Sequence, residues 1–439
     1  MSPSYRQIIR LVWPLALGML NNAVLQFVDR VFLSRESMAS IEAALPASMF
    51  AFIVVGFFQS VVAYSGTFVA QYHGAGNARG VAMAYRAGTL IALVSGLLSV
   101  AVVPLGLKAL PLISANPDVV WRAKTYYTII SCGAVALCGQ MAASSYFTGR
   151  GLTRLVFWVN LGGNILNIIL DPLLIFTCGL GIAGAAYATV LAMFAQWGVL
   201  AWCARGGKSA PSCGGEPPLW TLILRILRFG VPSGAYSVLN ILSFTIFVFV
   251  TGRVGDVAFA VSNACFSVNW LLIAPMEGFA IGASTLVAQC QGRGDSEAAK
   301  VALRRTLALA LSVVAALSIG VVVFNRPILS LFAPGDAAVS GEFYSLGYVL
   351  IILMAAWQMF DAADVVVSGA LKGAGDTKFV MWWMVAVAFG FWLPLVWVVR
   401  CFHNTMPALW CTMVAYVVVI CVGELIRWRI GKWKGIKLV

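Results

Sequence analysis

Charged side chains are scarce in this chain. Asp, Glu, Lys and Arg make up 10% of its 439 residues, whereas hydrophobic residues make up 61% and the mean hydropathy is +0.92. Soluble domains carry roughly 25% charged residues. The composition therefore excludes an ordinary soluble core and predicts a polytopic membrane protein.

Histidine is almost absent, and cysteine occurs in no recognisable motif. The two histidines, His73 and His403, fall in expected loops, and the ten cysteines form no CxxC pair or Cys/His cluster. This excludes a zinc site, a disulfide framework and a Ser/His/Asp catalytic set. We expect neither an enzyme nor a bound cofactor. A cleavable signal peptide is not expected either, because the first apolar run is long and no small-residue cleavage site follows it.

The apolar runs are long enough for twelve membrane spans, each of which needs about 20 residues. They lie near 8–33, 43–70, 82–106, 125–148, 155–177, 182–203, 222–251, 257–289, 301–324, 341–370, 379–399 and 406–428. Alternate loops carry 21 and 8 Lys and Arg residues, so the positive-inside rule predicts an inner-membrane protein with both termini in the cytoplasm. The net charge of +13 is thus explained by topology, and no nucleic-acid partner is expected.

The chain repeats itself at an offset of 218 residues. Residues 284–295 echo residues 66–77, with Ala-Gln pairs at 288/289 and 70/71, and Pro14 and Pro232 differ by the same offset. Duplicated membrane proteins without a large soluble part are typically transporters, with the site near the repeat interface.

A Gly/Pro/Ser-rich linker at 205–219 divides the repeats. We therefore expect an all-α fold of two six-helix lobes, residues 1–204 and 220–439. Because each lobe has an even number of spans, the repeats should be parallel.

Acids inside membrane spans are candidates for function, because burying one at a helix centre costs about 2.5–3.5 kcal/mol. Five lie well inside spans: Asp29, Asp171, Glu277, Asp361 and Asp364. Glu424 lies near a helix end, where we expect an interfacial position. Asp361 and Asp364 share a helical face, and Glu277 follows Pro275 by two residues.

The richest pattern surrounds Asp171. Asn164, Asn167 and Asp171 are spaced i, i+3, i+7 and so share one helical face. Pro172 follows and frees backbone carbonyls nearby. A carboxylate, amides and free carbonyls suit a proton or sodium site, although a polar stripe that joins helices has the same pattern.

These motifs resemble the multidrug and toxic compound extrusion (MATE) family over nearly the whole chain. The resemblance rests on the Ala-Gln-x-x-Gly-x-Gly repeats, Phe27-Val28-Asp29 and Asn167-Ile168-Ile169-Leu170-Asp171-Pro172. It implies a cation site for a proton or sodium in the N-lobe. The matching positions are Asp29, Asn167, Asp171 and Thr189, with Pro14 as a hinge in the first helix.

The chain also departs from the family pattern. Arg30 and then Ser34-Arg35-Glu36-Ser37 replace a small hydroxyl residue and a Gly-x-x-Gly after the first-helix acid. In some relatives a C-lobe site uses an acid on helix seven with an aromatic and an acid on helix ten. Trp357 and Asp361 match the last two, whereas Asn240 stands for the helix-seven acid, which favours the N-lobe site.

We therefore expect a cation-coupled antiporter that exports cationic or amphipathic organic compounds and acts as a monomer among membrane lipids. Two alternatives differ in class. A lipid-linked oligosaccharide flippase would share the architecture but usually has added helices or a strongly basic cavity. A membrane enzyme that modifies lipids would need a catalytic or metal-binding cluster, which the sequence does not show.

Overall fold

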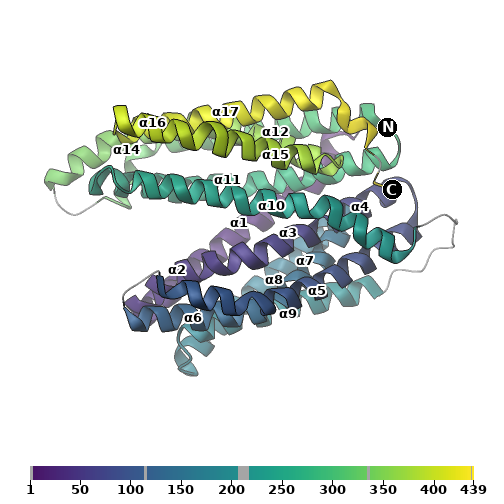
Figure 1. The fold of residues 1–439 in the computed structure, drawn as a ribbon, viewed down its shortest axis with the longest axis horizontal. Helices are drawn as coiled ribbons and strands as arrows, with labels where there is room; N and C mark the ends of the chain where they lie inside the picture. Colours follow the sequence, from purple (N-terminus) through teal and green to yellow (C-terminus); the bar gives the residue numbers. More distant parts are fainter. Residues whose placement is uncertain (1–2, 113–115, 206–216, 334–336, 437) are drawn as a thin grey trace. The chain divides into compact units, whose positions relative to one another are not determined.

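The computed structural model describes residues 3–112, 116–205, 217–333, 337–436 and 438–439 (Figure 1). Within these residues the chain is helical and contains no strand, which confirms the all-α fold. The helices of the first half are α1 (Tyr5–Glu36), α2 (Met38–Ala51), α3 (Phe57–Ala63), α4 (Ser65–Gly74), α5 (Ala78–Ala109), α6 (Pro117–Cys132), α7 (Ala134–Gly149), α8 (Thr153–Pro172) and α9 (Ile182–Arg205). Those of the second half are α10 (Leu219–Thr251), α11 (Asp256–Gly292), α12 (Ser296–Val323), α13 (Asn325–Ser330), α14 (Ala337–Gly373), α15 (Thr377–Val387), α16 (Leu393–Phe402) and α17 (Met406–Ile430).

Short helical turns of other types join some of these elements. The π-helical turns are η1 (Phe52–Gly56), η3 (Leu173–Thr177) and η4 (Ala388–Trp392), and the 3-10 turns are η2 (Leu110–Leu112) and η5 (Lys432–Gly435). The turn η3 follows Pro172 directly, as expected where a proline disturbs the regular hydrogen-bond ladder.

The number of spans agrees with the sequence. Among the described residues, 11 stretches are long and apolar enough to cross a membrane, and α6 with α7 makes a twelfth that is bent by 46°. The bend falls at Gly133, where a Cβ would collide with the side chain of Val190 in α9. Glycine at this position therefore permits the close approach of α9 to the broken span.

The helices pack into two compact units whose boundaries fall inside helices. Unit 1 comprises Met1–Ala16, Leu239–Val287 and Ser296–Lys437, and unit 2 comprises Leu17–Val238, Ala288–Asp295 and Leu438–Val439. The division cuts α1 two residues after Pro14 and α10 six residues after Pro232. These packing units differ from the sequence lobes 1–204 and 220–439, which describe the repeat and stay a prediction. Residues 206–216 of the predicted linker lie outside the described residues.

The start of α1 is held inside unit 1 by specific contacts. The guanidinium of Arg305 donates to the Pro3 carbonyl at 2.6 Å and lies 5.3 Å from the ring centroid of Tyr5. Further along α1, a Cβ on Gly278 of α11 would collide with the backbone of Ala16. The segment that contains Pro14 is therefore closely packed against α11.

Small residues bring the helices of unit 2 together around its core. Ala43, Ala47 and Ala51 recur on one face of α2, which packs against α6. Such small side chains let helix backbones approach closely in a membrane. The same core includes Leu33 of α1 and Ile175 of η3, so it fixes the segments that carry the acids described below.

The two copies of the repeated motif meet inside unit 2. A Cβ on Gly74 would collide with the backbone carbonyl of Gln289, and a Cβ on Gly292 would collide with that of Gln71. The two contacts are equivalent in the repeat. Gly292 is the counterpart of Gly74, and Gln289 is the counterpart of Gln71, each at the offset of 218 residues. The Gln289 side chain also donates to the Gly149 carbonyl at 2.9 Å.

Candidate cation-coupling site

One face of α8 carries a line of polar side chains in unit 2. Asn160, Asn164, Asn167 and Asp171 follow one another at intervals of three or four residues. The last three are at most 2% exposed. This confirms that Asn164, Asn167 and Asp171 share a buried face, as their spacing predicts.

Asn167 joins three helices at this face. With its amide nitrogen facing α1, it donates to Asp29 Oδ1 at 3.2 Å, and its oxygen accepts from the backbone N–H of Thr189 in α9 at 3.1 Å. Asp29, Asn167 and Thr189 were all predicted for the cation site, and the structure brings them together.

Asp171 completes the group from one helical turn further along α8. Its side chain is 0% exposed, and neither carboxylate oxygen accepts a hydrogen bond from a described donor. It interacts electrostatically with Asp29. Two adjacent carboxylates out of water repel each other, so the pair favours the uptake of positive charge.

Thr189 contributes its backbone more directly than its hydroxyl. The hydroxyl donates to the Ala185 carbonyl at 3.0 Å, a bond within α9. Its oxygen lone pairs remain able to accept from a donor or to face a cation.

Asn164 belongs to a neighbouring chain of amides. Its nitrogen donates to Asn22 Oδ1 of α1 at 2.9 Å, and its oxygen accepts from Gln196 Nε2 of α9 at 3.3 Å. The predicted candidate Asn164 thus supports the packing of α1, α8 and α9 beside the acids without bonding to them. Glycine at position 163 makes room, because a Cβ there would collide with Gln196.

Three residues of this region were not predicted from the sequence. Tyr126 of α6 interacts with both acids and bonds to Ser48. Asn22 lies seven residues before Asp29 on the same face of α1, a spacing that could have identified it. For Tyr126 and Gln196 the sequence holds no comparable signal, because their roles depend on which helices pack together.

Apart from Asn164, the secondary candidates lie in unit 1, and most of them are neighbours. Asp361 and Asp364 follow one another on α14, and Asp361 interacts with the indole of Trp357 and with Glu277 of α11. Asn240 of α10 interacts with Tyr416, which also interacts with both α14 acids.

The expectation for Glu424 is wrong. Although it lies in the last two turns of α17, its side chain is 0% exposed, and neither oxygen accepts a hydrogen bond from a described donor. The reason is that α14 packs along α17 and covers this face, so a position near a helix end is not an interfacial one here.

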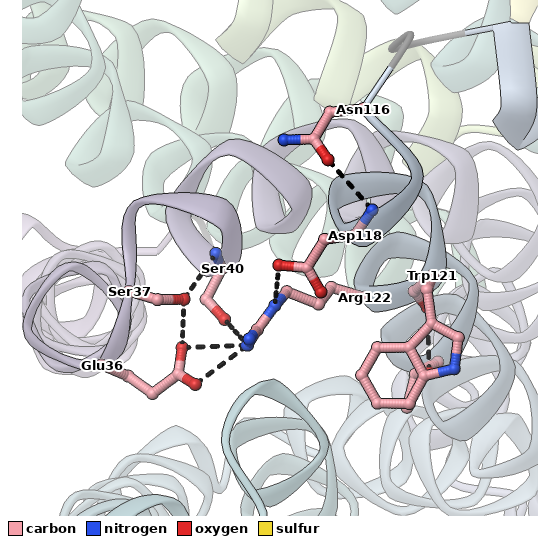
Figure 2. A network of polar contacts seen from close by, with 8 residues as sticks. Glu36, Ser37, Ser40, Asn116, Asp118, Trp121 and Arg122 are labelled. Atoms are coloured by element: carbon pink, nitrogen blue, oxygen red, sulfur yellow. Dashed lines mark hydrogen bonds and ion pairs between the residues drawn. The ribbon is translucent and has the colours of Figure 1, made fainter.

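The junction of α1 and α2 is held by an ion-pair network (Figure 2). Nη1 of Arg122 in α6 donates to both carboxylate oxygens of Glu36, at 2.9 and 3.2 Å, and to Ser40 Oγ at 2.8 Å. Its Nε donates to Asp118 at 3.1 Å. Ser37 caps α2 and donates to Glu36 at 2.7 Å. The sequence that replaces the family's Gly-x-x-Gly thus anchors α1 to α6.

Most helices of the chain are long and apolar enough to cross a membrane, and in unit 2 α1, α8 and α9 bring an acid pair together. These features define a polytopic membrane protein of the transporter class. The MatE family model matches residues 14–173 and 232–398, and these segments begin at the two prolines of the repeat. The chain therefore belongs to the MatE family, whose members are transporters rather than enzymes.

Known relatives match most of the chain. A probable multidrug resistance protein NorM from Thermotoga maritima is 25% identical over 378 residues, which cover 83% of this chain and 79% of the relative. The multidrug resistance protein NorM from Burkholderia vietnamiensis is 25% identical over 437 residues, which cover 96% of this chain and 92% of the relative.

Solved structures share the fold. The crystal structure of a MATE in complex with MaL6 has a TM-score of 0.84 at 19% identity, over 98% of this chain and 97% of that one. The eukaryotic MATE transporter AtDTX14 also has a TM-score of 0.84 at 19% identity, over 98% of this chain and 96% of its own.

Proposed function

We propose that this protein is a multidrug exporter that exchanges cationic or amphipathic organic compounds for an inward-moving cation. The observation that carries the proposal is the pair formed by half-buried Asp29 and fully buried Asp171, with Asn167 joining Asp29 to Thr189. Relatives named multidrug resistance proteins support the substrate class.

The acid pair has the chemistry for coupling. Both acids ionised would place two adjacent negative charges away from water, so binding one cation is strongly favoured there. A membrane potential supplies about 2.3 kcal/mol per charge per 100 mV to drive that cation inward.

The arrangement favours a proton over sodium. Asn167 presents its nitrogen to Asp29, and its oxygen is used by the Thr189 backbone. In this orientation the amide donates to the carboxylate, which supports a proton as the coupling ion in our proposal.

Binding of a cation would weaken the contact between α1 and α8. A neutral Asp29 accepts a weaker hydrogen bond from Asn167 than a charged one does. This loosens α1 from α8, and Pro14 supplies a place to bend just before the boundary between the packing units. By reciprocity, substrate and cation must weaken each other's binding if they are exchanged.

Efflux of a fluorescent organic cation from proteoliposomes, under imposed proton or sodium gradients, tests the proposal. We expect a proton gradient to drive efflux in the wild type and in Glu42→Gln, an exposed acid of α2, but not in Asp171→Asn. Gradient-driven efflux that survives Asp171→Asn would contradict coupling at this pair. Absence of efflux for a broad panel of dyes would redirect the search to a dedicated substrate such as a lipid-linked oligosaccharide.

We also propose that the protein is a monomer in the inner membrane with cytoplasmic termini. Cys178 and Cys401 are exposed, and we expect both to face the outside, because Cys178 follows the fifth span and Cys401 lies at the end of the eleventh. In single-cysteine variants, a membrane-impermeant maleimide added to intact cells should label these two residues and spare Cys203, near the end of α9. The reverse labelling pattern would refute the orientation.

A further inference from the structure

A second group of ionisable side chains lies in unit 1, away from Asp29 and Asp171. Lys372, in the last turn of α14, interacts electrostatically with Asp364 of the same helix, Glu424 of α17 and Glu277 of α11. The group we call the lysine cluster consists of these four residues. α14 packs along α17, and Asp364 and Glu424 interact with each other between these two helices.

Burial increases across the lysine cluster. Glu277 is exposed and Lys372 is half-buried, whereas Asp364 is 5% and Glu424 is 0% exposed. Neither oxygen of Glu424 accepts a hydrogen bond from a described donor, and one oxygen of Asp364 likewise lacks one. Asp364 and Glu424, which are the most buried acids of the cluster, need compensation from within the protein.

The nearby basic side chains carry too little positive charge to balance both Asp364 and Glu424 as carboxylates. Arg427 lies one turn beyond Glu424 on α17, but it is held by Asp376, with Nε donating to Oδ2 at 2.6 Å and Nη2 to Oδ1 at 3.2 Å. Lys372 is then one ammonium facing two buried carboxyl groups. An uncompensated buried carboxylate costs far more than a neutral carboxylic acid.

A metal ion does not fit this need. No group of three or more acidic, His or Cys side chains among the described residues is placed to hold one. Among the residues that the structure describes, Asp361 of α14 and Tyr416 and Cys421 of α17 also interact with the buried acids, and none of the three adds positive charge.

We propose that Asp364 and Glu424 share one bound proton, with Lys372 as the fixed positive charge and Glu277 at the exposed end of the cluster. The lysine cluster is thus a proton-binding site separate from the Asp29–Asp171 pair. Its part in transport rests on the proposed antiport, but the bound proton itself does not. Either acid alone would balance Lys372 and need no proton.

Infrared spectroscopy of the full-length protein in nanodiscs detects protonated carboxyl groups directly. The background for the test is Asp29→Asn/Asp171→Asn, which removes the acids of unit 2. At neutral pH we expect Glu424→Gln and Asp364→Asn each to lower the protonated-carboxyl band by about one group, and the two together by no more than either alone. Lys372→Met should raise the band by about one group, because both acids must then be neutral.

An equal loss of the protonated-carboxyl band in each single variant and in the double variant would distinguish a shared proton from a cluster with only a structural role. A band unchanged in Glu424→Gln and in Asp364→Asn, or losses that add in the double variant, would overturn the proposal. A band that sodium removes would instead identify a metal-cation site and overturn it too. Glu42→Gln is the matched control and should leave the band unchanged. Because these readings need no transport, failure of the dye-efflux experiment would leave them interpretable.

Discussion

The backbone of Gly292 lies directly against the carbonyl of Gln71, where a side chain would collide with it. Gly74 has the same relationship to Gln289. The repeated motif therefore has a packing role in unit 2. The glycine of each copy leaves the space that the backbone of the other copy occupies.

Replacing either glycine should destabilise the protein. Gly292→Ala and Gly74→Ala force backbone to shift, and overpacking of this kind costs about 1–3 kcal/mol. Thermal unfolding in detergent should show a lower midpoint for both. Gly162→Ala is the control, because a Cβ there meets no atom within 4 Å. Equal midpoints for Gly292→Ala and Gly162→Ala would contradict the close approach.

Asn167→Leu should impair coupling more strongly than Asn164→Leu does. The variant removes the amide that donates to Asp29, and hydrogen bonds to charged groups contribute about 1.5–3 kcal/mol. The proton concentration for half-maximal dye efflux should therefore change by roughly ten- to 100-fold. Asn164→Leu, which breaks the bonds to Asn22 and Gln196, should lower stability with a smaller effect on this concentration. The same proton dependence in Asn167→Leu and wild type would count against the site.

Breaking the link between Arg122 and Glu36 should destabilise unit 2. Both side chains are about one-fifth exposed, so solvent screening reduces the effect of these charge-assisted bonds to about 1–2 kcal/mol. A double-mutant cycle of Arg122→Gln and Glu36→Gln should show that the two changes are coupled. Arg35→Gln changes an exposed neighbour and should be neutral. Strictly additive effects in the cycle would show that the ion pair contributes nothing.

Pro14→Ala should slow transport and spare substrate binding. Alanine restores the N–H that a regular helix needs and removes the clash that favours bending. We expect dye efflux to fall about tenfold while equilibrium dye affinity stays within about twofold. Pro104→Ala, also inside a long helix, is the control and should leave efflux unchanged. A Pro14→Ala protein with wild-type efflux would exclude a hinge at this position.

Helical spacing was enough to predict the α8 part of the site. Asn164, Asn167 and Asp171 recur at the helical period, and a helix places such residues on one face whatever surrounds it. The long apolar runs likewise predicted the helical architecture, because each run is long enough to cross a membrane as a helix. Both features are local or periodic in the sequence, so they can be recognised without knowing which helices pack together.

Contacts between distant helices could not be predicted in this way. Arg122 lies 86 positions from Glu36, and nothing in either segment specifies the other as its partner. Glu424 was misplaced for the same reason, because its burial depends on α14 covering α17. The residues Tyr126 and Lys372 acquire their surroundings only when several helices have packed.

The division of α1 after Ala16 has a consequence for synthesis of the chain at the ribosome. The first sixteen residues emerge first, yet their packing partners in unit 1 begin at Leu239. Unit 2 must likewise await residues Ala288–Asp295 before Gly74 meets Gln289. Neither unit can therefore be completed when translation reaches the midpoint, and the early helices must be retained in the bilayer until most of the second half has been inserted.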